Sequence, residues 1–292
     1  MQIILILSLT KSQKMDIIVA SSRGRGLEEL LKKSHPYPEQ VEVIFTPSAT
    51  LNIITKEALK KINSLKSSGQ DNIHAYIIGG YCDLTSREKG STKINGRWRT
   101  YEEVVFWEDP ESAVARLNKN IHTTVTEISN TNVTPIICTI PPANIETWNT
   151  VRKSQRKTYE LKHTVDYPKM QQRLQDSLIQ INRYIITLNM KSRAHTPKLA
   201  NTVIQKKGKG KGYRVYFDNL KDGVHATDDT AKRWAEMIME AIRTNRGYAK
   251  PTKAAKPSEP PKRIITVPSG TDSESESEHP TKRNKFTIEN KV

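Results

Sequence analysis

The chain has 292 residues, of which 35% are hydrophobic, and its 47 Lys and Arg residues outnumber its 31 Asp and Glu residues to give a net charge of +16. This length suits one sizeable domain, and the low hydrophobic content indicates that part of the chain lies outside a packed core. The charge favours polyanionic partners such as nucleic acid or an anionic membrane surface. The two cysteines, Cys82 and Cys138, are too few for a disulfide framework or a cysteine-based zinc site, which indicates a reducing compartment.

The first nine residues are mostly apolar, as in a secretory signal peptide. They lack the charged segment that opens such a signal, and no small-residue cleavage site precedes Lys11. No apolar run approaches the roughly 18 residues that a membrane span requires, so no span is expected. We therefore interpret residues 1–14 as an N-terminal extension of a domain that covers residues 15–246.

Strand and helix patterns alternate through this domain. The run Ile17-Ile18-Val19-Ala20 is typical of a buried parallel strand, and after a turn rich in serine and glycine, Leu27, Leu30 and Leu31 recur at helical spacing. Further strands are predicted at 41–45, 73–78, 133–140 and 213–217, and further helices at 54–65, 111–130, 170–188 and 231–242. This alternation predicts a flavodoxin-like three-layer α/β/α sandwich around a mainly parallel sheet of five strands.

Three segments interrupt the pattern. Residues 85–110 contain Asn95-Gly96, a dipeptide that favours a two-residue hairpin turn between strands at 91–94 and 97–101. Residues 143–166 are polar and give no clear element, and their Trp148 either lines a cleft or joins a small separate core. Residues 206–212 alternate lysine and glycine, which predicts a mobile basic loop.

From residue 247 to 292 the composition changes to Pro, Lys, Ser and Glu with few large apolar residues, which predicts a disordered tail. Two basic clusters, Lys262-Arg263 and Lys282-Arg283, flank a serine and glutamate tract at 272–278. The clusters are typical of nuclear import signals or polyanion-binding patches, so we expect an intracellular protein, cytoplasmic or nuclear. The tract suits an acidophilic kinase, whose phosphates would offset the neighbouring positive charge.

Residues that can act as nucleophiles, acids or bases lie next to three of the predicted elements. Ser22 ends the first strand, the turn Gly80-Tyr81-Cys82-Asp83 follows the third, and Asp222-Gly223-Val224-His225 precedes the last helix. A parallel sheet brings such turns to one edge, where ligands bind. Serine, histidine and aspartate there are the elements of a hydrolytic triad.

Taken in order, these turns resemble the blocks of the SGNH hydrolase family, the GDSL-type esterases, and in particular its divergent members from mobile elements and viruses. The Gly-Asp-Ser block is similar to Ala20-Ser21-Ser22, the Gly-x-Asn-Asp block to residues 80–83, and the Asp-x-x-His block to Asp222 and His225. A second block resembles residues 47–51. The similarity spans about residues 15 to 245.

This resemblance implies a role for each matching residue. Ser22 would be the nucleophile, His225 the general base and Asp222 the residue that orients the imidazole. The implied oxyanion and substrate-binding positions are Ser48, Gly80, Cys82 and Asp83, with the N–H groups of Ser22 and Gly80 as donors. Serine replaces the family's glycine at Ser48 and cysteine its asparagine at Cys82, which predicts a weakened oxyanion hole because a thiol is a poor donor. No cofactor or metal is implied.

The same residues also allow other interpretations. Ser21 or Ser22 can simply cap a helix, and Gly24-Arg25-Gly26 resembles the start of a phosphate-binding loop, although neither phosphate motif is complete. His225 can pack or cap without a chemical role. Cys82 can be an alternative nucleophile or redox-sensitive thiol, or a buried, unreactive one.

The sequence is therefore compatible with two functions. The favoured one is hydrolysis of an acyl ester or removal of an acetyl group by a serine hydrolase. The alternative is a catalytically inactive SGNH-like scaffold that binds nucleic acid or a protein partner through its basic surface and tail. Non-specific affinity for nucleic acid is compatible with either function and should fall steeply with salt.

Overall fold

The computed structural model describes residues 14–106, 108–155, 165–207 and 212–248. Contacts divide the chain into two units, Met1–Lys250 and Pro251–Val292, and every described residue belongs to the first. The predicted N-terminal extension, except for residue 14, and the predicted tail from 249 onward lie outside the described residues, as do positions 208–211 of the basic loop.

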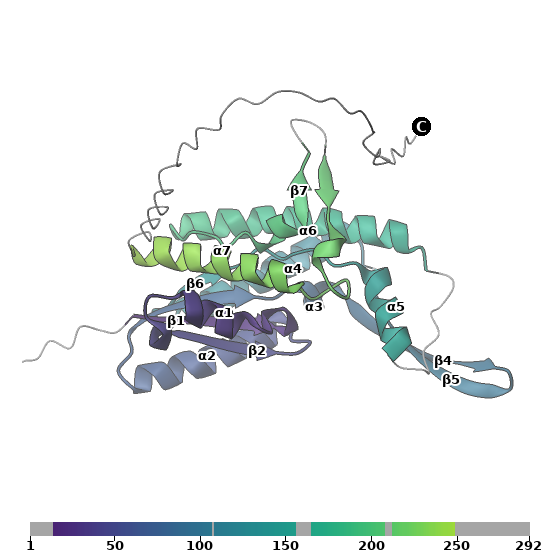
Figure 1. Ribbon diagram of the computed structural model, residues 1–292, viewed down its shortest axis with the longest axis horizontal. Helices are drawn as coiled ribbons and strands as arrows, with labels where there is room; N and C mark the ends of the chain where they lie inside the picture. Colours follow the sequence, from purple (N-terminus) through teal and green to yellow (C-terminus); the bar gives the residue numbers. More distant parts are fainter. Residues whose placement is uncertain (1–13, 107, 156–164, 208–211, 249–292) are drawn as a thin grey trace, which may run out of the picture. The chain divides into compact units, whose positions relative to one another are not determined.

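A parallel sheet forms the centre of the first unit (Figure 1). Its strands in spatial order are β2 (Val41–Thr46), β1 (Lys14–Ser21), β3 (Asn72–Ile78) and β6 (Thr134–Ile137). Every residue of β1 after Lys14 is buried, which explains why this strand reads as a continuous apolar run and not as an alternating one. The predicted parallel sheet is thus confirmed.

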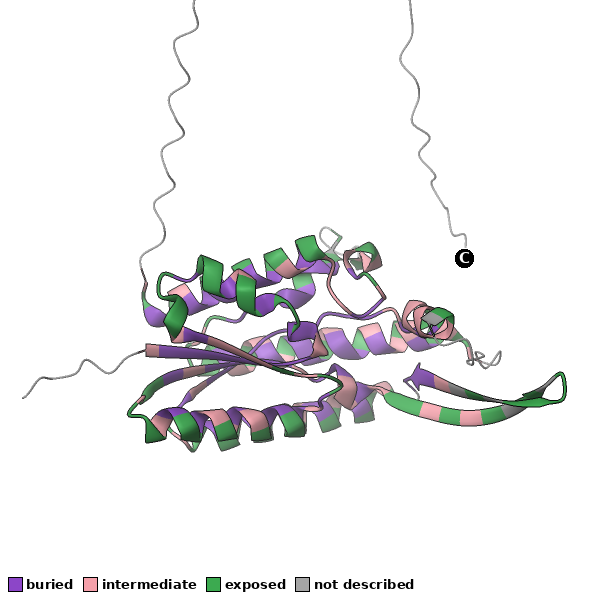
Figure 2. Ribbon diagram, turned by 60° about the horizontal axis from the view of Figure 1, so that its bottom comes forward, coloured by how far each residue is buried: buried purple, intermediate pink, exposed green. Residues whose placement is uncertain are grey.

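Helices cover both faces of the sheet. Ile17 and Val19 of β1 pack in the core under one set of helices, while Ile18 and Ala20 pack under the other, as the two-residue period of a strand requires. The first set is α2 (Leu51–Ser67), α4 (Pro110–Ser129) and α6 (Tyr167–Lys191), and the second is α1 (Leu27–Ser34) and α7 (Asp228–Arg246). Figure 2 shows the buried stripe that each helix turns toward the sheet. The three predicted layers are confirmed.

The sheet has four strands where the sequence predicts five. The expected fifth, at 213–217, is instead β8 (Tyr213–Val215), which pairs antiparallel with β7 (Ile204–Lys206). Beyond β6, the side chain of Asn189 hydrogen-bonds both the N–H (3.2 Å) and the C=O (2.8 Å) of Ile137. Because side chains of α6 already satisfy these backbone groups, no further strand is needed at that edge.

The segments between these layers also form regular elements. The predicted hairpin is confirmed as β4 (Ser86–Ile94) and β5 (Arg97–Val105), and positive φ angles at Asn95 (46°) and Gly96 (78°) form its turn. The unassigned segment contains α5 (Ile145–Gln155). The remaining short helices are α3 (Tyr81–Leu84), η1 (Ser22–Gly24), η2 (Pro38–Gln40), η3 (Leu199–Thr202) and η4 (Phe217–Asn219).

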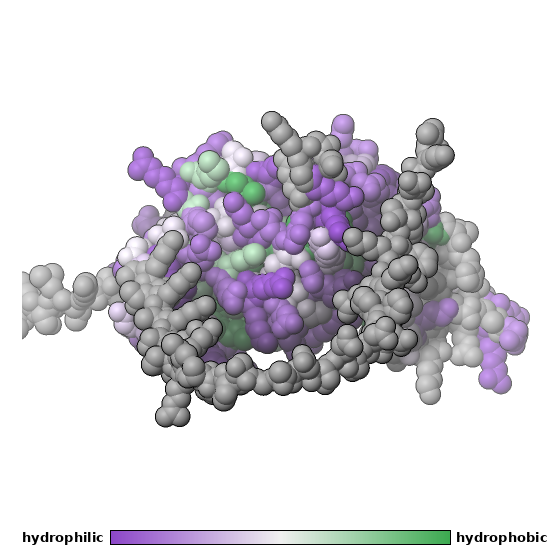
Figure 3. All heavy atoms as spheres, turned by 45° about the horizontal axis from the view of Figure 1, so that its top comes forward, coloured by the Kyte–Doolittle hydropathy of each residue, from purple (hydrophilic) through white to green (hydrophobic). Residues whose placement is uncertain are grey.

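The surface of the described part is largely hydrophilic on the face that Figure 3 shows, with a few separate apolar patches. Among the described residues, no helix combines the length and the apolar content that crossing a membrane would take.

Candidate active site

Ser22 lies at the carboxyl end of the central strand. β1 ends at Ser21 and η1 begins at Ser22, so the side chain is placed where three parallel strands finish. Helix α1 begins only at Leu27, and its N-cap residue is Gly26 in the left-handed conformation, so neither serine caps this helix; Ser21, the N-cap residue of η1, makes no side-chain capping bond. The capping interpretation is therefore wrong for this turn, and the Ser22 hydroxyl is free for another partner.

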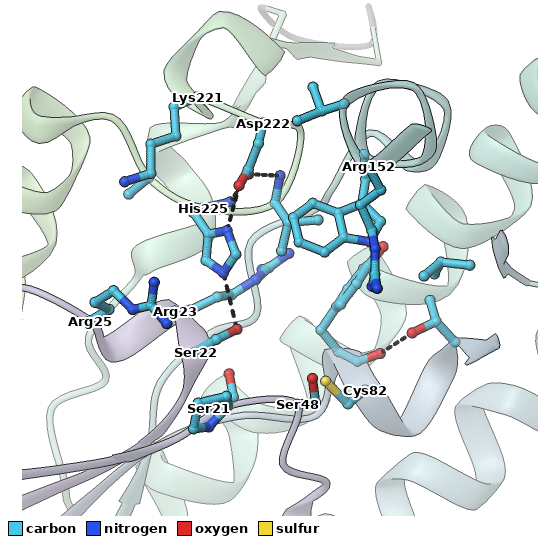
Figure 4. Close-up of a pocket in the computed structure, with 18 of the residues that line it drawn as sticks. Ser21, Ser22, Arg23, Arg25, Ser48, Cys82, Arg152, Lys221, Asp222 and His225 are labelled. Atoms are coloured by element: carbon cyan, nitrogen blue, oxygen red, sulfur yellow. Dashed lines mark hydrogen bonds and ion pairs between the residues drawn. The ribbon is translucent and has the colours of Figure 1, made fainter. Parts of the chain in front are cut away.

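That partner is His225. The Nε2 atom of His225 lies 3.1 Å from the Ser22 Oγ, although the two residues are 203 positions apart in the chain. On the other side of the ring, Nδ1 lies 2.6 Å from the Oδ2 of Asp222. A proton on Nδ1, held by this carboxylate, leaves the Nε2 lone pair to accept the serine O–H. Figure 4 shows the three side chains as one hydrogen-bonded line.

Asp222 is held as a carboxylate. Burial alone would raise its pKa, but hydrogen bonds from the His225 ring and from the backbone N–H groups of His225 (2.7 Å) and Val224 (3.0 Å) outweigh burial, so the pKa is lowered. The ionised side chain can therefore orient the imidazole and stabilise its protonated form at neutral pH.

The turn that carries these two residues is packed against α5. Gly223 has a φ of +83°, and a Cβ there would lie 2.5 Å from the backbone oxygen of Asn144, so only glycine fits. The backbone N–H of Asn144 donates a hydrogen bond of 2.7 Å to the backbone oxygen of Gly223. This contact brings Trp148 of α5 over the site, with its ring edge-on to His225 at a centroid distance of 5.4 Å. Trp148 therefore lines the cleft rather than a separate core.

Ser48 and Cys82 both line the pocket beside Ser22. Ser48 has a φ of +57°, the left-handed region that glycine favours, so the backbone keeps this conformation although the residue is serine. Its hydroxyl accepts a hydrogen bond of 2.7 Å from Arg87. Burial raises the pKa of the Cys82 thiol, which keeps it protonated and argues against its role as a nucleophile.

Gly80 and Asp83 do not line the pocket. Gly80 adopts a φ of +98°, and a Cβ there would lie 2.7 Å from Ile140 Cδ1. The Asp83 carboxylate accepts the backbone N–H of Leu51 at 2.9 Å and so holds the start of α2, which follows the turn containing Ser48. We assign Asp83 a positioning role, in place of the predicted contact with substrate.

Cationic side chains surround the triad in a cavity of about 880 Å³. The cationic residues that line it are Arg23, Arg25, Arg87, Arg152 and Lys221. None of them was among the predicted site residues. Arg23 directly follows Ser22 and Lys221 directly precedes Asp222, so the sequence offered a signal for both, whereas Arg87 and Arg152 come from segments that only the fold brings to the site. Among the described residues, no group of His, Cys, Asp and Glu side chains is placed to hold a metal ion.

The fold can now be compared with known proteins. No protein-family model and no curated protein matches the sequence. Among solved structures, a protein from Bacteroides fragilis assigned as an acylhydrolase aligns with a TM-score of 0.52 at 14% identity, over 80% of this chain and 89% of that one. The fold is SGNH-like, an α/β architecture with a central parallel sheet.

Two further structures align with this SGNH-like domain. A GDSL-like lipase from Bacteroides thetaiotaomicron gives a TM-score of 0.48 at 12% identity over 80% of this chain and 89% of its own. A protein from Slackia heliotrinireducens assigned to the SGNH hydrolases gives 0.44 at 12% identity over 79% of this chain and all of its own. At 14% identity, the alignment with the Bacteroides fragilis protein shows a shared fold alone, so activity is argued from the site itself.

Proposed function

We propose that this protein is a serine hydrolase that cleaves acyl esters, acetyl esters among them. The observation that carries the proposal is the continuous hydrogen-bonded line from Ser22 through His225 to Asp222. In an SGNH-like fold, this line ends in a serine hydroxyl at the edge of the sheet where ligands bind. A helix-capping or packing role for these residues explains neither of the two bonds made by the imidazole.

The reaction follows from the geometry. His225 Nε2 takes the proton of the Ser22 hydroxyl as Oγ attacks the acyl carbon, and the carbonyl π electrons move to oxygen. When the tetrahedral intermediate collapses, the C–O bond to the alcohol breaks and the imidazolium protonates the departing oxygen. Water, deprotonated by His225, then attacks the acyl carbon. The bond from this carbon to Ser22 Oγ breaks, the imidazolium returns its proton to Oγ, and the acid is released. Asp222 remains ionised throughout.

The weakest part of this machinery is the oxyanion site. The Ser22 N–H is the expected backbone donor, and the left-handed backbone at Ser48 supports a second one from that turn. Cys82 offers a thiol where the family resemblance implies an amide. We expect turnover below that of a site with the amide, since the loss of one such donor typically costs about 100-fold or more.

Hydrolysis of a short neutral ester, 4-nitrophenyl acetate, tests the proposal. We expect Ser22→Ala to lower kcat by about 1,000-fold or more, because the nucleophile is removed. Ser21→Ala is the matched control: its hydroxyl is adjacent but makes no hydrogen bond to His225, so activity should be retained. A wild-type protein that hydrolyses no short ester, or a Ser22→Ala variant that remains active, would contradict the proposal.

A second candidate function, binding of single-stranded nucleic acid, is favoured by the tip of the β4–β5 hairpin. Trp98 is 70% exposed there, next to the exposed Arg97 and opposite Lys93 in the strand pairing. Figure 1 shows that this hairpin extends away from the central sheet. An exposed aromatic ring among cations suits a base that stacks and phosphates that are neutralised.

Fluorescence anisotropy with a labelled single-stranded oligonucleotide tests this binding. Trp98→Ala should weaken binding by about 10-fold, the scale of one lost stacking contact. Tyr37→Ala, which removes an exposed ring elsewhere on the surface, should leave it unchanged. Equal affinities for wild type and Trp98→Ala at low salt would rule out the hairpin as the binding surface.

A further inference from the structure

Most of the charged residues around the triad are positively charged. Five cationic side chains line the cavity, and the only acidic residue among its lining residues is Asp222. That carboxylate is committed to His225 by a contact of 2.6 Å. The residues that line the pocket therefore carry a net positive charge, and in a partly enclosed site the attraction of an anion is stronger than on an open surface.

The five cations differ in how far their charge is already neutralised. Arg87 and Arg152 share the carboxylate of Glu102, at 3.3 Å and 3.8 Å. Arg25 and Lys221, by contrast, are exposed and have no ion pair with any residue in the described part of the chain. Figure 4 shows Arg25 and Lys221 on one side of His225 and Arg152 on the other. The free positive charge thus lies on one side of the nucleophile.

Arg23 adds a buried donor to the same pocket. Its residue is only 5% exposed, its guanidinium stacks 4.5 Å from the centre of the Tyr81 ring, and one nitrogen donates to the Pro141 oxygen. The Nε atom and the other terminal nitrogen are buried and have no hydrogen-bond partner among the described residues. Burial lowers the pKa of this group, and a buried donor without a partner carries a free-energy cost. An acceptor supplied by a ligand would remove that cost.

We propose that the ester hydrolysed in this pocket carries a phosphate group, which is bound by Arg23, Arg25 and Lys221 beside the acyl group attacked by Ser22. The inference rests on the proposed hydrolase function and specifies its substrate class. Phosphate fits better than a carboxylate because it carries a charge of about −1.5 to −2 and offers three acceptor oxygens to several cations. The cavity, about 880 Å³, is of the size that encloses a small molecule, so the substrate is a small acylated phosphate ester.

A matched pair of substrates tests the phosphate directly: monoacetylglycerol and its 3-phosphate. For the wild type, kcat/KM should be about 10-fold or more higher for the phosphate ester, since hydrogen bonds to a charged group contribute about 1.5–3 kcal/mol each. This preference should shrink as salt is raised. In the double variant Arg25→Gln, Lys221→Gln, the ratio of the two kcat/KM values should fall toward one.

The control is Lys60→Gln, Lys191→Gln, which removes the same charge from two exposed lysines that do not line the pocket. It should keep the wild-type ratio. If the wild type shows no preference for the phosphate ester, or if the Arg25 and Lys221 variant keeps the preference, the proposed phosphate site is wrong while the hydrolase function stands.

Binding separates this proposal from the function on which it rests. Calorimetric titration with glycerol 3-phosphate should show binding to Ser22→Ala that glycerol does not show, and adding the Arg25 and Lys221 changes should abolish it. If no ester is hydrolysed but this binding is found, the hydrolase function fails and the phosphate site remains. Absence of binding contradicts the phosphate site, whatever the esterase assay shows.

Discussion

Besides Ala20 and Ser21 in the first block, Cys82 and Ser48 are the positions at which this site departs from the SGNH pattern. The thiol of Cys82 lines the pocket, and burial raises its pKa, so it stays a neutral and weak hydrogen-bond donor. Ser48 departs in a milder way, because its backbone already has the left-handed φ of +57° that a glycine would adopt. We therefore propose that Cys82, and not Ser48, is the residue that weakens oxyanion stabilisation.

Cys82→Asn should raise kcat on 4-nitrophenyl acetate by about 10-fold, because an amide N–H replaces the thiol beside the developing oxyanion. Cys82→Ala is the control and should change kcat little, since it removes only a weak donor. The measurement is steady-state kinetics of both variants against the wild type. An asparagine variant with unchanged kcat would place the oxyanion elsewhere in the pocket.

Single residues also show what the sequence alone could predict about the site. Ser22, Asp222 and His225 stand in local turns with recognisable spacing, and the structure brings all three together. Arg152 and Trp148 carry no such local signal. Their place in the pocket depends on how the turn at Gly223 packs against α5, which is a contact between distant segments.

At the scale of elements, α7 directly follows the turn that contains Asp222 and His225, and an ion pair fixes the far end of this helix. The Nε of Arg246 lies 3.0 Å from Asp16 Oδ1, and both side chains are almost fully buried. The same guanidinium also donates to the backbone oxygen of Met15 in β1 at 2.5 Å. The pair therefore ties the end of α7 to the start of the central strand.

Arg246→Met should lower the free energy of unfolding by about 3–5 kcal/mol, because it leaves the Asp16 carboxylate buried without its charged partner. The double variant Asp16→Asn, Arg246→Met should be less destabilised than Arg246→Met alone. Lys232→Met, on the exposed face of α7, should cost less than about 1 kcal/mol. Urea unfolding measures all three, and an Arg246→Met variant as stable as the wild type would refute this anchoring role.

Elements also show where sequence patterns stop being sufficient. Periodicity identifies the helices and buried strands, because the spacing of apolar residues indicates which side of an element is buried. It does not indicate which strands pair with each other, so the pattern at residues 213–215 predicts a strand of the central sheet although these residues pair with β7. The bonds from Asn182 to Ile140 and from Asn189 to Ile137 that finish the sheet edge arise from polar residues inside a helix, which no strand pattern signals.

At the scale of the whole molecule, the three layers follow from the alternation of strands and helices, and the SGNH-like architecture follows from the order of the blocks. The chain has a net charge of +16, and five of its cationic residues line the pocket around the triad. The predicted disorder of the tail at residues 247–292, of which 249–292 lie outside the described residues, stays a prediction, as do the intracellular location and the origin in a mobile element or virus.

The central claim is that Ser22 is a nucleophile activated by His225. Labelling of the full chain with a fluorophosphonate, followed by intact mass and peptide mapping, tests it most directly because the probe forms a covalent bond only with an activated serine. We predict one adduct, on Ser22, which is lost in Ser22→Ala and strongly slowed in His225→Gln, while Ser21→Ala is labelled like the wild type. No adduct on the wild type, or an adduct on another serine, would contradict the claim.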